Sequence, residues 1–333
     1  MSIGIGVIGA GIMGADHAKI IARQIAGAHV AAICDADARR AEAVAADSNA
    51  GGIFSDPLEL IRSPKVDAVL IASPDVTHAP YTLATLEARK PVLCEKPLSP
   101  VTAECVKVME AEVKLGQRLI QVGFMRRFDP AYVDMKSQLR AGKVGAALML
   151  HCAHRNVSSS PGWTAAMSVT NSAVHEFDIC RWLLDTEYRS IRVMASRPSG
   201  KVNFSDPLLI VIETANGQLI DVEVFINAVY GYDVRTELVG ETGTLTMVPP
   251  VTTLARNGLA ESQPFPADWR PRFADAYRIQ MQDWVGNLAK GIGSGASAWD
   301  GYVATAVAEA GVAALASGQA TAIKLLDKPR LYA

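Results

Sequence analysis

The stretch IGIGVIGAGIMG, residues 3–14, decides the fold of the first part of the chain. Its apolar start, Ile3–Ile8, predicts a buried strand, and the following glycines form a G-x-G-x-x-G pattern where a helix begins. The first glycine permits a tight turn, the second lets the backbone approach a pyrophosphate, and the third lets helix and strand pack closely. We therefore expect a dinucleotide-binding turn whose cofactor contacts are Gly9, Gly11, Ile12, Met13 and Gly14.

Beyond this turn, apolar runs alternate with helical patterns as far as residue 122. The predicted strands are Ile3–Ile8, His29–Cys34, Val66–Ala72, Pro91–Cys94 and Leu119–Val122. Continuous apolar runs separated by helices are typical of a parallel sheet covered on both faces. The fold class is therefore α/β, with a doubly wound Rossmann domain over residues 1–122.

The pattern changes to a period of two in the second part of the chain. Strands are predicted at Ala147–Asn156, Leu208–Thr214, Gln218–Val229, Val234–Val239 and Thr244–Val248. Helices are predicted at Asn171–Leu184, Asp275–Ala289 and Ala298–Ala316, with a proline-rich loop over Gln263–Pro271. We expect an α+β domain over residues 123–333 with a large, mainly antiparallel, open-faced sheet, and a C-terminal helix that can pack back on the first domain.

Composition excludes several classes of protein. The chain has 333 residues, 50% hydrophobic, and a formal net charge of −2, which argues against a nucleic-acid partner. Neither a signal peptide nor an apolar run long enough to cross a membrane is recognisable. The five cysteines are scattered, which fits reduced thiols in the cytoplasm, and no cluster of metal ligands is found.

Asp35 follows the second predicted strand, about 20 residues after the glycine-rich turn. A carboxylate at this point accepts hydrogen bonds from the ribose hydroxyls and repels a 2′-phosphate, so NAD is favoured over NADP. The alternatives are that Asp35 caps the next helix, and that Arg39 and Arg40 hold a 2′-phosphate instead of lying on a solvated helix face.

Two further clusters follow predicted parallel strands, where ligands bind in doubly wound sheets. In the first, Ser73, Pro74 and His78 are expected to line the dinucleotide, although His78 could instead cap or pack against the next helix. In the second, Glu95 and Lys96 precede Pro97, and Lys96 is expected to point toward the nicotinamide. The alternative for Lys96 is an ordinary surface lysine at a strand end.

The helix predicted over Asn171–Leu184 carries a candidate base. At 100° per residue, Asn171, His175 and Asp178 share a face that differs from the face of the apolar residues. A histidine with polar partners four residues before it and three after it is a better candidate for a general base than a lone histidine.

These segments together resemble the glucose–fructose oxidoreductase/inositol dehydrogenase (Gfo/Idh/MocA) family. GAGIMG, Asp35, the segments 72–78 (ASPDVTH) and 94–98 (CEKPL), and the segment 171–178 (NSAVHEFD) occur in the order typical of that family. Residues 124–130 and 221–232 resemble its inositol 2-dehydrogenase branch. The resemblance covers the whole chain and implies a Rossmann domain followed by an open-faced sheet domain. It also implies a homotetramer formed through the C-terminal sheets.

The resemblance implies that Lys96 and His175 lie at the substrate carbon. His175 would take the proton of a secondary hydroxyl while hydride passes to nicotinamide, and Lys96 would position the substrate and stabilise the oxyanion. The remaining substrate contacts are expected to be Met125, Arg126, His154, Asn156, Asn171 and Tyr232. For Arg126, His154, Asn156 and Tyr232, hydrogen bonds that only support the fold are an equal alternative.

The sequence departs from the family at Asn171, where an aspartate is usual. An amide orients the imidazole but carries no charge, so either His175 is a weaker base here or Asp178 supplies the charge. The predicted activity is NAD-dependent oxidation of a cyclic polyol, foremost myo-inositol to 2-keto-myo-inositol. The alternatives are another inositol isomer or a pyranose sugar as substrate, a non-catalytic NAD-sensing regulator, and an NAD-dependent glycosidase.

Overall fold

The computed structural model describes residues 2–197, 200–248, 253–288 and 290–333. The chain forms two compact units. The first consists of Met1–Met125, Asp275–Thr305 and Leu326–Ala333, and the second of Arg126–Ala274 and Ala306–Leu325. The division of the chain into two domains near residue 122 stays a prediction.

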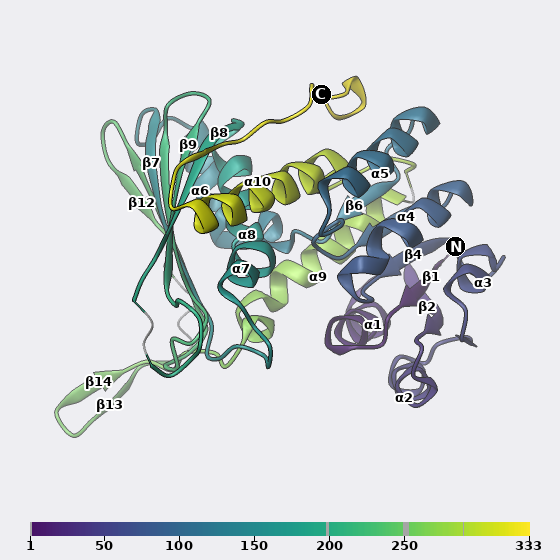
Figure 1. Cartoon of the computed structure of the whole chain (residues 1–333). Helices are drawn as coiled ribbons and strands as arrows, with labels where there is room; N and C mark the ends of the chain where they lie inside the picture. Colours follow the sequence, from purple (N-terminus) through teal and green to yellow (C-terminus); the bar gives the residue numbers. More distant parts are fainter. Residues whose placement is uncertain (1, 198–199, 249–252, 289) are drawn as a thin grey trace. The chain divides into compact units, whose positions relative to one another are not determined.

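The first unit contains the predicted parallel sheet (Figure 1). Its six strands are β1 (Ile3–Ile8), β2 (Ala28–Cys34), β3 (Ile53–Phe54), β4 (Ala68–Ile71), β5 (Val92–Cys94) and β6 (Ile120–Val122). They lie in the order β3-β2-β1-β4-β5-β6, and all pairs are parallel. This is the doubly wound order of Rossmann folds, whose ligand crevice opens at the carboxyl ends of the strands. The predicted fold class is confirmed.

The helices of this unit connect the strands. They are α1 (Ile12–Gln24), α2 (Ala38–Ser48), α3 (Pro57–Arg62), α4 (His78–Glu87) and α5 (Thr102–Leu115), joined by most of α9 (Trp269–Leu288) and the start of α10 (Ala298–Ser317). Short 3-10 turns are η1 (Asp75–Thr77), η2 (Met125–Phe128) and η4 (Arg330–Tyr332). The sequence missed β3 and α3 because two and six residues are too few to show a period.

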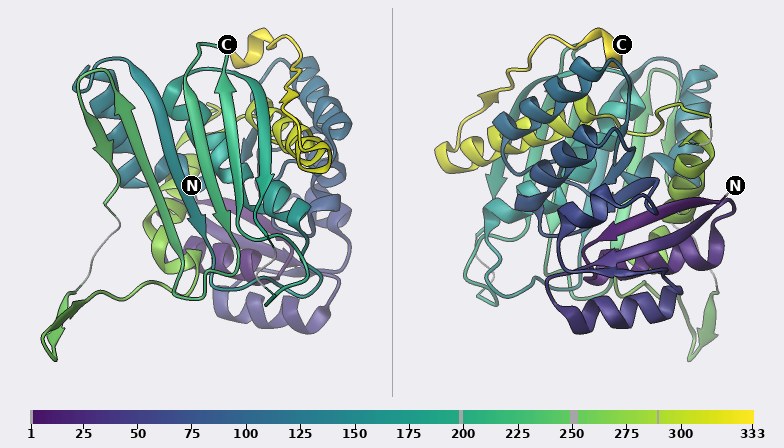
Figure 2. Two further views of the ribbon diagram at one scale, coloured as in Figure 1. Left: turned by 60° about the vertical axis from the view of Figure 1, so that its left-hand side comes forward. Right: turned by 90° about the vertical axis from the view of Figure 1, so that its right-hand side faces the viewer.

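The second unit is built on a seven-stranded sheet, seen face-on in the left view of Figure 2. Its strands are β7 (Ala147–Arg155), β8 (Tyr188–Ala195), β9 (Leu208–Thr214), β10 (Leu219–Phe225), β11 (Asp233–Gly240), β12 (Thr244–Thr246) and β15 (Thr321–Ala322). The order is β12-β11-β7-β10-β9-β8-β15, and only the β10–β7 pair is parallel. The mainly antiparallel sheet was predicted correctly, but β8 and β15 were missed.

One face of this sheet is covered by helices of the same unit, and the other is open. The hydroxyls of Tyr132 on α6 (Pro130–Arg140) and Thr236 on β11 lie 2.9 Å apart, and the Sγ atoms of Cys180 on α8 (Val174–Leu184) and Cys152 on β7 lie 3.6 Å apart. Because side chains alternate along a strand, the opposite face carries partly exposed residues such as His151 and Asp221. The expectation of an open-faced sheet is confirmed.

The region around His175 differs from the predicted helix. α8 begins at Val174, and Asn171 lies in a π-helical turn, η3 (Ser168–Ser172), which follows the short α7 (Ala165–Met167). Counting 100° per residue back to Asn171 was therefore wrong, because a π turn holds more residues than an α turn. Every residue from Val174 to Cys180 is buried, so the polar face of this helix is as buried as its apolar face.

Two features near residue 260 were also missed. A two-stranded hairpin, β13 (Ala255–Asn257) and β14 (Ala260–Ser262), has all its strand residues exposed. The predicted loop Gln263–Pro271 is too long, because helix α9 already begins at Trp269. The carboxylate of Asp268 accepts a hydrogen bond from Arg270 N at 2.9 Å at the start of this helix. Pro271 lies in the first turn of α9, where proline is tolerated. The last residue of the helix predicted over Asp275–Ala289 lies outside the described residues.

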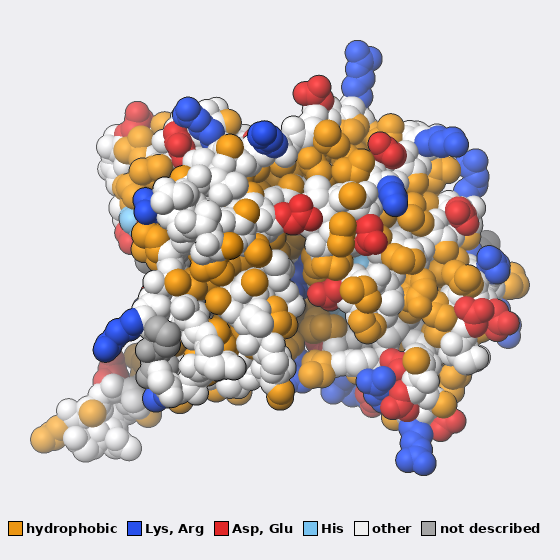
Figure 3. Space-filling model, in the orientation of Figure 1, with side chains coloured by type: hydrophobic (Ala, Val, Ile, Leu, Met, Phe, Trp, Pro, Cys, Tyr) orange, Lys and Arg blue, Asp and Glu red, His pale blue; other side chains and the backbone are white. Residues whose placement is uncertain are grey.

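The surface carries charges of both signs. On the face drawn in Figure 3, Lys and Arg side chains are scattered among Asp and Glu side chains and apolar atoms. Within the described ranges, no helix is both long and apolar enough to cross a membrane.

Candidate active site

The glycine-rich turn joins β1 to α1 and has the geometry that the sequence predicted. Gly9 has φ +98°, and a Cβ placed on it would lie 2.5 Å from the carbonyl oxygen of Ala72. A Cβ on Gly14 would lie 1.8 Å from the oxygen of Gly9, whereas a Cβ on Gly11 would have nothing within 4 Å. The N-terminus of α1 receives no side-chain cap at Gly11. An open backbone approach to uncapped N–H groups fits a dinucleotide pyrophosphate.

Asp35 ties the end of β2 to this turn. Its Oδ2 accepts a hydrogen bond from Ala10 N at 2.6 Å, and its Oδ1 accepts from Asp37 N at 2.8 Å and from Arg40 Nη2 at 3.0 Å. Asp37, not Asp35, caps α2. A carboxylate has about four lone-pair sites, so Asp35 keeps acceptor capacity for a ribose hydroxyl. The charge of Arg40 is balanced by Asp35 and Asp37, which favours NAD over NADP.

Asp35→Ser should raise the ratio of kcat/KM for NADP over NAD by roughly tenfold or more. The change removes the negative charge that repels a 2′-phosphate and releases Arg40 to bind it. Steady-state rates with both cofactors measure the effect. The double variant Asp35→Ser/Arg40→Ala should lose most of the gain. An unchanged ratio in the single variant would mean that the ribose is held elsewhere.

His78 bridges the loops that follow β4 and β5. Its side chain is buried, with Nδ1 2.7 Å from the carbonyl oxygen of Pro97 and Nε2 2.9 Å from that of Ser73. Because carbonyl oxygens only accept, both ring nitrogens must donate, so the ring is protonated. Burial lowers the pKa of His78, but Cys94 and the Pro97 carbonyl outweigh burial and raise it to about 10. The alternative structural role of His78 is therefore supported, and a direct cofactor contact from His78, Ser73 or Pro74 stays a prediction.

His78→Gln should destabilise the protein in a pH-dependent way. The folded pKa lies above that of an unfolded histidine, so the stabilisation is complete below pH 6.5 and is lost as pH rises toward 10. The difference in Tm between wild type and variant should therefore be largest at pH 6 and shrink steadily by pH 10. His29→Gln, at an exposed histidine, is the control and should show no such slope. A Tm difference that is constant with pH would contradict a protonated His78.

Glu95 joins the strand end that carries Lys96 to helix α1. Its Oε1 lies 2.7 Å from His17 Nε2, and its Oε2 accepts a bond from Lys96 N at 3.1 Å. Burial raises the pKa of Glu95, but His17 and Lys96 lower it below its ordinary value overall. The carboxylate thus fixes the backbone at Lys96, and the Lys96–Pro97 peptide bond is cis. Direct contact of Glu95 with the cofactor stays a prediction. The role of His17 was not predicted, because no pattern in the sequence singles it out.

In the second unit, predicted substrate residues surround a buried ion pair. Arg126 and Glu176 are each about 1% exposed and form a salt bridge, and Glu176 Oε2 lies 2.9 Å from His154 Nδ1. Burial raises the pKa of Glu176, but Arg126 and His154 lower it to about 2. The guanidinium carbon of Arg126 lies 5.4 Å from the centre of the Phe273 ring. Glu176 was not predicted, although it is the neighbour of His175 in the sequence.

The ring of His154 also lies near His175 and Tyr232. The ring centres are 6.2 Å apart for His154 and His175 and 5.9 Å apart for His154 and Tyr232. Arg126, His154, His175 and Tyr232 are all buried, so the structure brings four of the predicted residues together around one hydrogen-bonding cluster.

The other predicted residues are placed as follows. Asn171 accepts a bond at its Oδ1 from the Thr170 hydroxyl at 2.6 Å. The backbone of Asn156 continues the sheet beyond β7, bonding to Phe225 and Ala228. Met125 is buried and belongs, like Lys96, to the first unit. Whether these residues touch substrate stays a prediction.

Asp178 is bound to a partner that the sequence did not indicate. Its carboxylate accepts two hydrogen bonds from the Arg127 guanidinium, from Nε at 2.9 Å and from Nη2 at 2.5 Å. A bidentate pair balances the charge of Asp178. That Asp178 also supplies charge to His175 stays a prediction.

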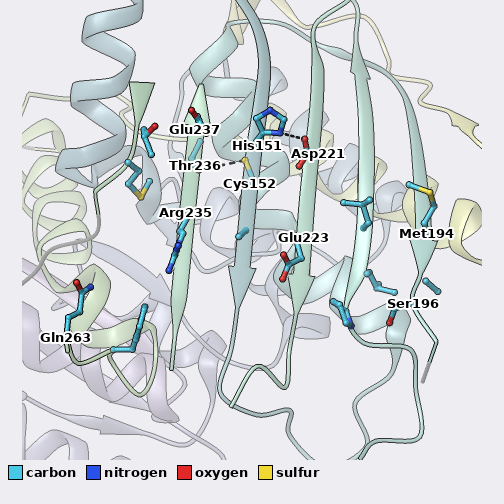
Figure 4. Close-up of a pocket in the computed structure, with 18 residues that line it drawn as sticks. His151, Cys152, Met194, Ser196, Asp221, Glu223, Arg235, Thr236, Glu237 and Gln263 are labelled. Carbon is cyan, nitrogen blue, oxygen red and sulfur yellow. Dashed lines mark hydrogen bonds and ion pairs between the residues drawn. The ribbon is translucent and has the colours of Figure 1, made fainter. Parts of the chain in front are cut away.

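A large hollow of about 920 Å³ lies on the open face of the sheet (Figure 4). Its lining includes His151, whose Nδ1 lies 2.5 Å from Asp221 Oδ2, together with Glu223 and Arg235. It contains none of the predicted substrate residues, and side-chain alternation puts His151 and His154 on opposite faces of β7. Among the described residues there is no group of three or more His, Cys, Asp and Glu side chains that could hold a metal ion.

A Rossmann unit with a dinucleotide-binding turn, together with a second unit built on an open-faced sheet, indicates a dinucleotide-dependent oxidoreductase. The chain belongs to the Gfo/Idh/MocA family. Residues 3–124 match the oxidoreductase family with an NAD-binding Rossmann fold, and residues 136–325 match its C-terminal alpha/beta domain. Its cofactor is NAD, which the turn and Asp35 fit.

Relatives and solved structures support this membership over the full length. The chain is 50% identical over 335 residues to inositol 2-dehydrogenase 1 of Saccharopolyspora erythraea, covering 100% of this chain and 99% of that protein. It is 44% identical to inositol 2-dehydrogenase of Paracoccus denitrificans, covering 100% of both. The crystal structure of myo-inositol dehydrogenase from Lactobacillus casei in complex with NAD(H) and myo-inositol aligns with a TM-score of 0.96 at 32% identity, again covering both chains completely.

Proposed function

We propose that the protein oxidises a cyclic polyol with NAD, foremost myo-inositol to 2-keto-myo-inositol. The observation that carries this proposal is the buried cluster of Arg126, His154, His175 and Tyr232 in a chain that is similar over its whole length to named inositol dehydrogenases. A neutral polyol presents several hydroxyl groups, each of which donates and accepts hydrogen bonds. A cluster with both donors and acceptors suits such a substrate, whereas it offers no excess of charge for an ionic one.

In the proposed mechanism, His175 removes the proton from the reacting hydroxyl. An imidazole ordinarily titrates near pH 6.5, which suits a base working near neutral pH. The ammonium group of Lys96 positions the hydroxyl and stabilises the negative charge that develops on its oxygen. NAD, when bound, accepts the hydride. Glu95 contributes by holding the backbone at Lys96.

Asn171→Asp should increase kcat at pH 7 by about two- to tenfold and shift the acid limb of the pH–rate profile toward higher pH, because a neighbouring carboxylate favours the protonated ring. The added carboxylate would stabilise the imidazolium that forms on His175, which the neutral amide of Asn171 does not do by charge. An aspartate can keep the hydrogen bond from Thr170. Asn171→Ala, the control, should lower kcat. An unchanged profile in Asn171→Asp would show that His175 is not a weakened base.

We also propose that the protein is cytoplasmic and forms a homotetramer through the open faces of the C-terminal sheets. Its five cysteines are all buried and free, as is usual in a reducing compartment. The open face exposes apolar side chains such as Met194, Leu209 and Leu219 between charged ones, which suits a partly polar contact between copies. Light scattering of the purified protein measures the assembly size.

The function is tested with purified protein, NAD and a panel of inositol isomers and pyranose sugars, by following NADH absorbance. We expect the highest kcat/KM with myo-inositol. NADH formation only with another isomer or a sugar would replace the substrate and keep the reaction. Binding of NAD without any NADH formation would favour a regulator, and cleavage of glycosides without net NADH would favour a glycosidase.

A further inference from the structure

His154 has two groups competing for one ring nitrogen. Its Nδ1 lies 2.9 Å from Glu176 Oε2 and 3.3 Å from Arg126 Nη2. A carboxylate only accepts hydrogen bonds and a guanidinium only donates them, so the two contacts require opposite protonation of Nδ1. Which contact is the hydrogen bond therefore decides which nitrogen of a neutral His154 carries the proton.

The geometry favours the carboxylate. A distance of 2.9 Å is typical of a charge-assisted N–H···O bond, whereas 3.3 Å lies beyond the usual range of N–H donors. If Nδ1 were unprotonated, its lone pair would face the lone pair of a carboxylate that Arg126 keeps ionised. Both side chains of the salt bridge are about 1% exposed, so water does not weaken this repulsion.

We propose that Glu176 is a positioning residue that holds His154 with its proton on Nδ1, so that Nε2 acts as a hydrogen-bond acceptor for a substrate hydroxyl. The hydrogen bond to a substrate hydroxyl rests on the function proposed above, whereas the position of the proton does not. The edge-to-face contact with Tyr232 restrains the ring from a second side. The buried ion pair of Glu176 and Arg126 thus makes Nε2 of His154 a hydrogen-bond acceptor in the cluster that includes His175, the predicted base.

Glu176→Gln tests the proposal because the shape of the side chain is kept. Arg126 requires an acceptor, so the amide oxygen should turn toward Arg126 and the amide NH₂ toward His154 Nδ1. The amide would then donate to Nδ1 and move the proton of His154 to Nε2. The control is Asp178→Asn, which replaces a buried carboxylate two residues away whose partner is Arg127.

The proton position is read directly by neutron diffraction from deuterium-exchanged crystals of the full chain without substrate. We expect deuterium on Nδ1 of His154 in wild type and in Asp178→Asn, and on Nε2 in Glu176→Gln. Deuterium on Nε2 in wild type, or no change in Glu176→Gln, would overturn the proposal. This readout stands even if no inositol is oxidised, so it separates this inference from the proposed function.

Steady-state kinetics test whether Glu176 acts through His154. In Glu176→Gln, KM for the polyol should rise about 10- to 100-fold with a much smaller change in kcat. In a His154→Ala background, the same substitution should change KM less than about twofold, because the acceptor is already absent. If Glu176→Gln raised KM in the His154→Ala background as much as it does in wild type, Glu176 would act on the stability of the fold and not through His154. That result would overturn its proposed role.

Discussion

Lys96→Met should lower kcat by about 10²- to 10³-fold at saturating NAD and polyol. Methionine keeps the length and the apolar stem of the side chain but removes the ammonium that is proposed to stabilise the developing oxyanion. The backbone should stay in place because Glu95 binds the Lys96 N–H, which the substitution keeps. Stopped-flow NADH formation separates this loss of chemistry from slow product release.

The matched control is Lys90→Met. Lys90 lies six residues earlier, and its ammonium donates to the carbonyl of Ser63 at 2.7 Å. This change should cost stability without lowering kcat. Binding of NAD, measured by calorimetry, should persist in both variants because the glycine-rich turn and Asp35 are unchanged. A drop in kcat of less than about fivefold in Lys96→Met would remove Lys96 from the catalytic role.

The cofactor half of the molecule could be predicted because its signals are local in the sequence. The steric need for glycine at positions 9 and 14 follows from a strand, a turn and a helix that are adjacent in the chain. The parallel sheet was recognisable for the same reason, since each buried strand is a continuous apolar run. Only elements too short to show a period, such as β3, escaped.

The partners of the site residues could not be predicted, because they come from distant parts of the chain. His17 and Glu95 are 78 residues apart, and Arg126 and Glu176 are 50 apart. Nothing in the composition of either segment indicates which charged residue meets which. Asp178 illustrates this, since its spacing pointed to His175 and its carboxylate binds Arg127. Helical spacing identifies which residues share a face only while the helix is regular, and the π turn at Asn171 breaks that rule.

Arg126→Met should lower the free energy of unfolding by about 3–5 kcal/mol at pH 7, because it leaves the Glu176 carboxylate buried without its cation. The loss should depend on pH. In wild type the pKa of Glu176 is about 2, below its unfolded value, so the salt bridge stabilises the fold above pH 4–5 and fades as pH falls toward 2. In the variant, burial without Arg126 raises the pKa, so Glu176 takes up a proton on acidification and the penalty is relieved. The difference in urea midpoint between wild type and variant should therefore narrow from pH 7 to pH 4.

The double variant Arg126→Met/Glu176→Gln separates charge from packing. If the cost of Arg126→Met comes from the uncompensated carboxylate, neutralising Glu176 should restore a large part of the stability at pH 7 and remove the pH dependence. If the cost comes from lost contact with Phe273, the double variant should be no more stable than the single one. That second result would mean that the ion pair fills space in the core and contributes little through its charge, since buried ion pairs can often be replaced by apolar residues without loss.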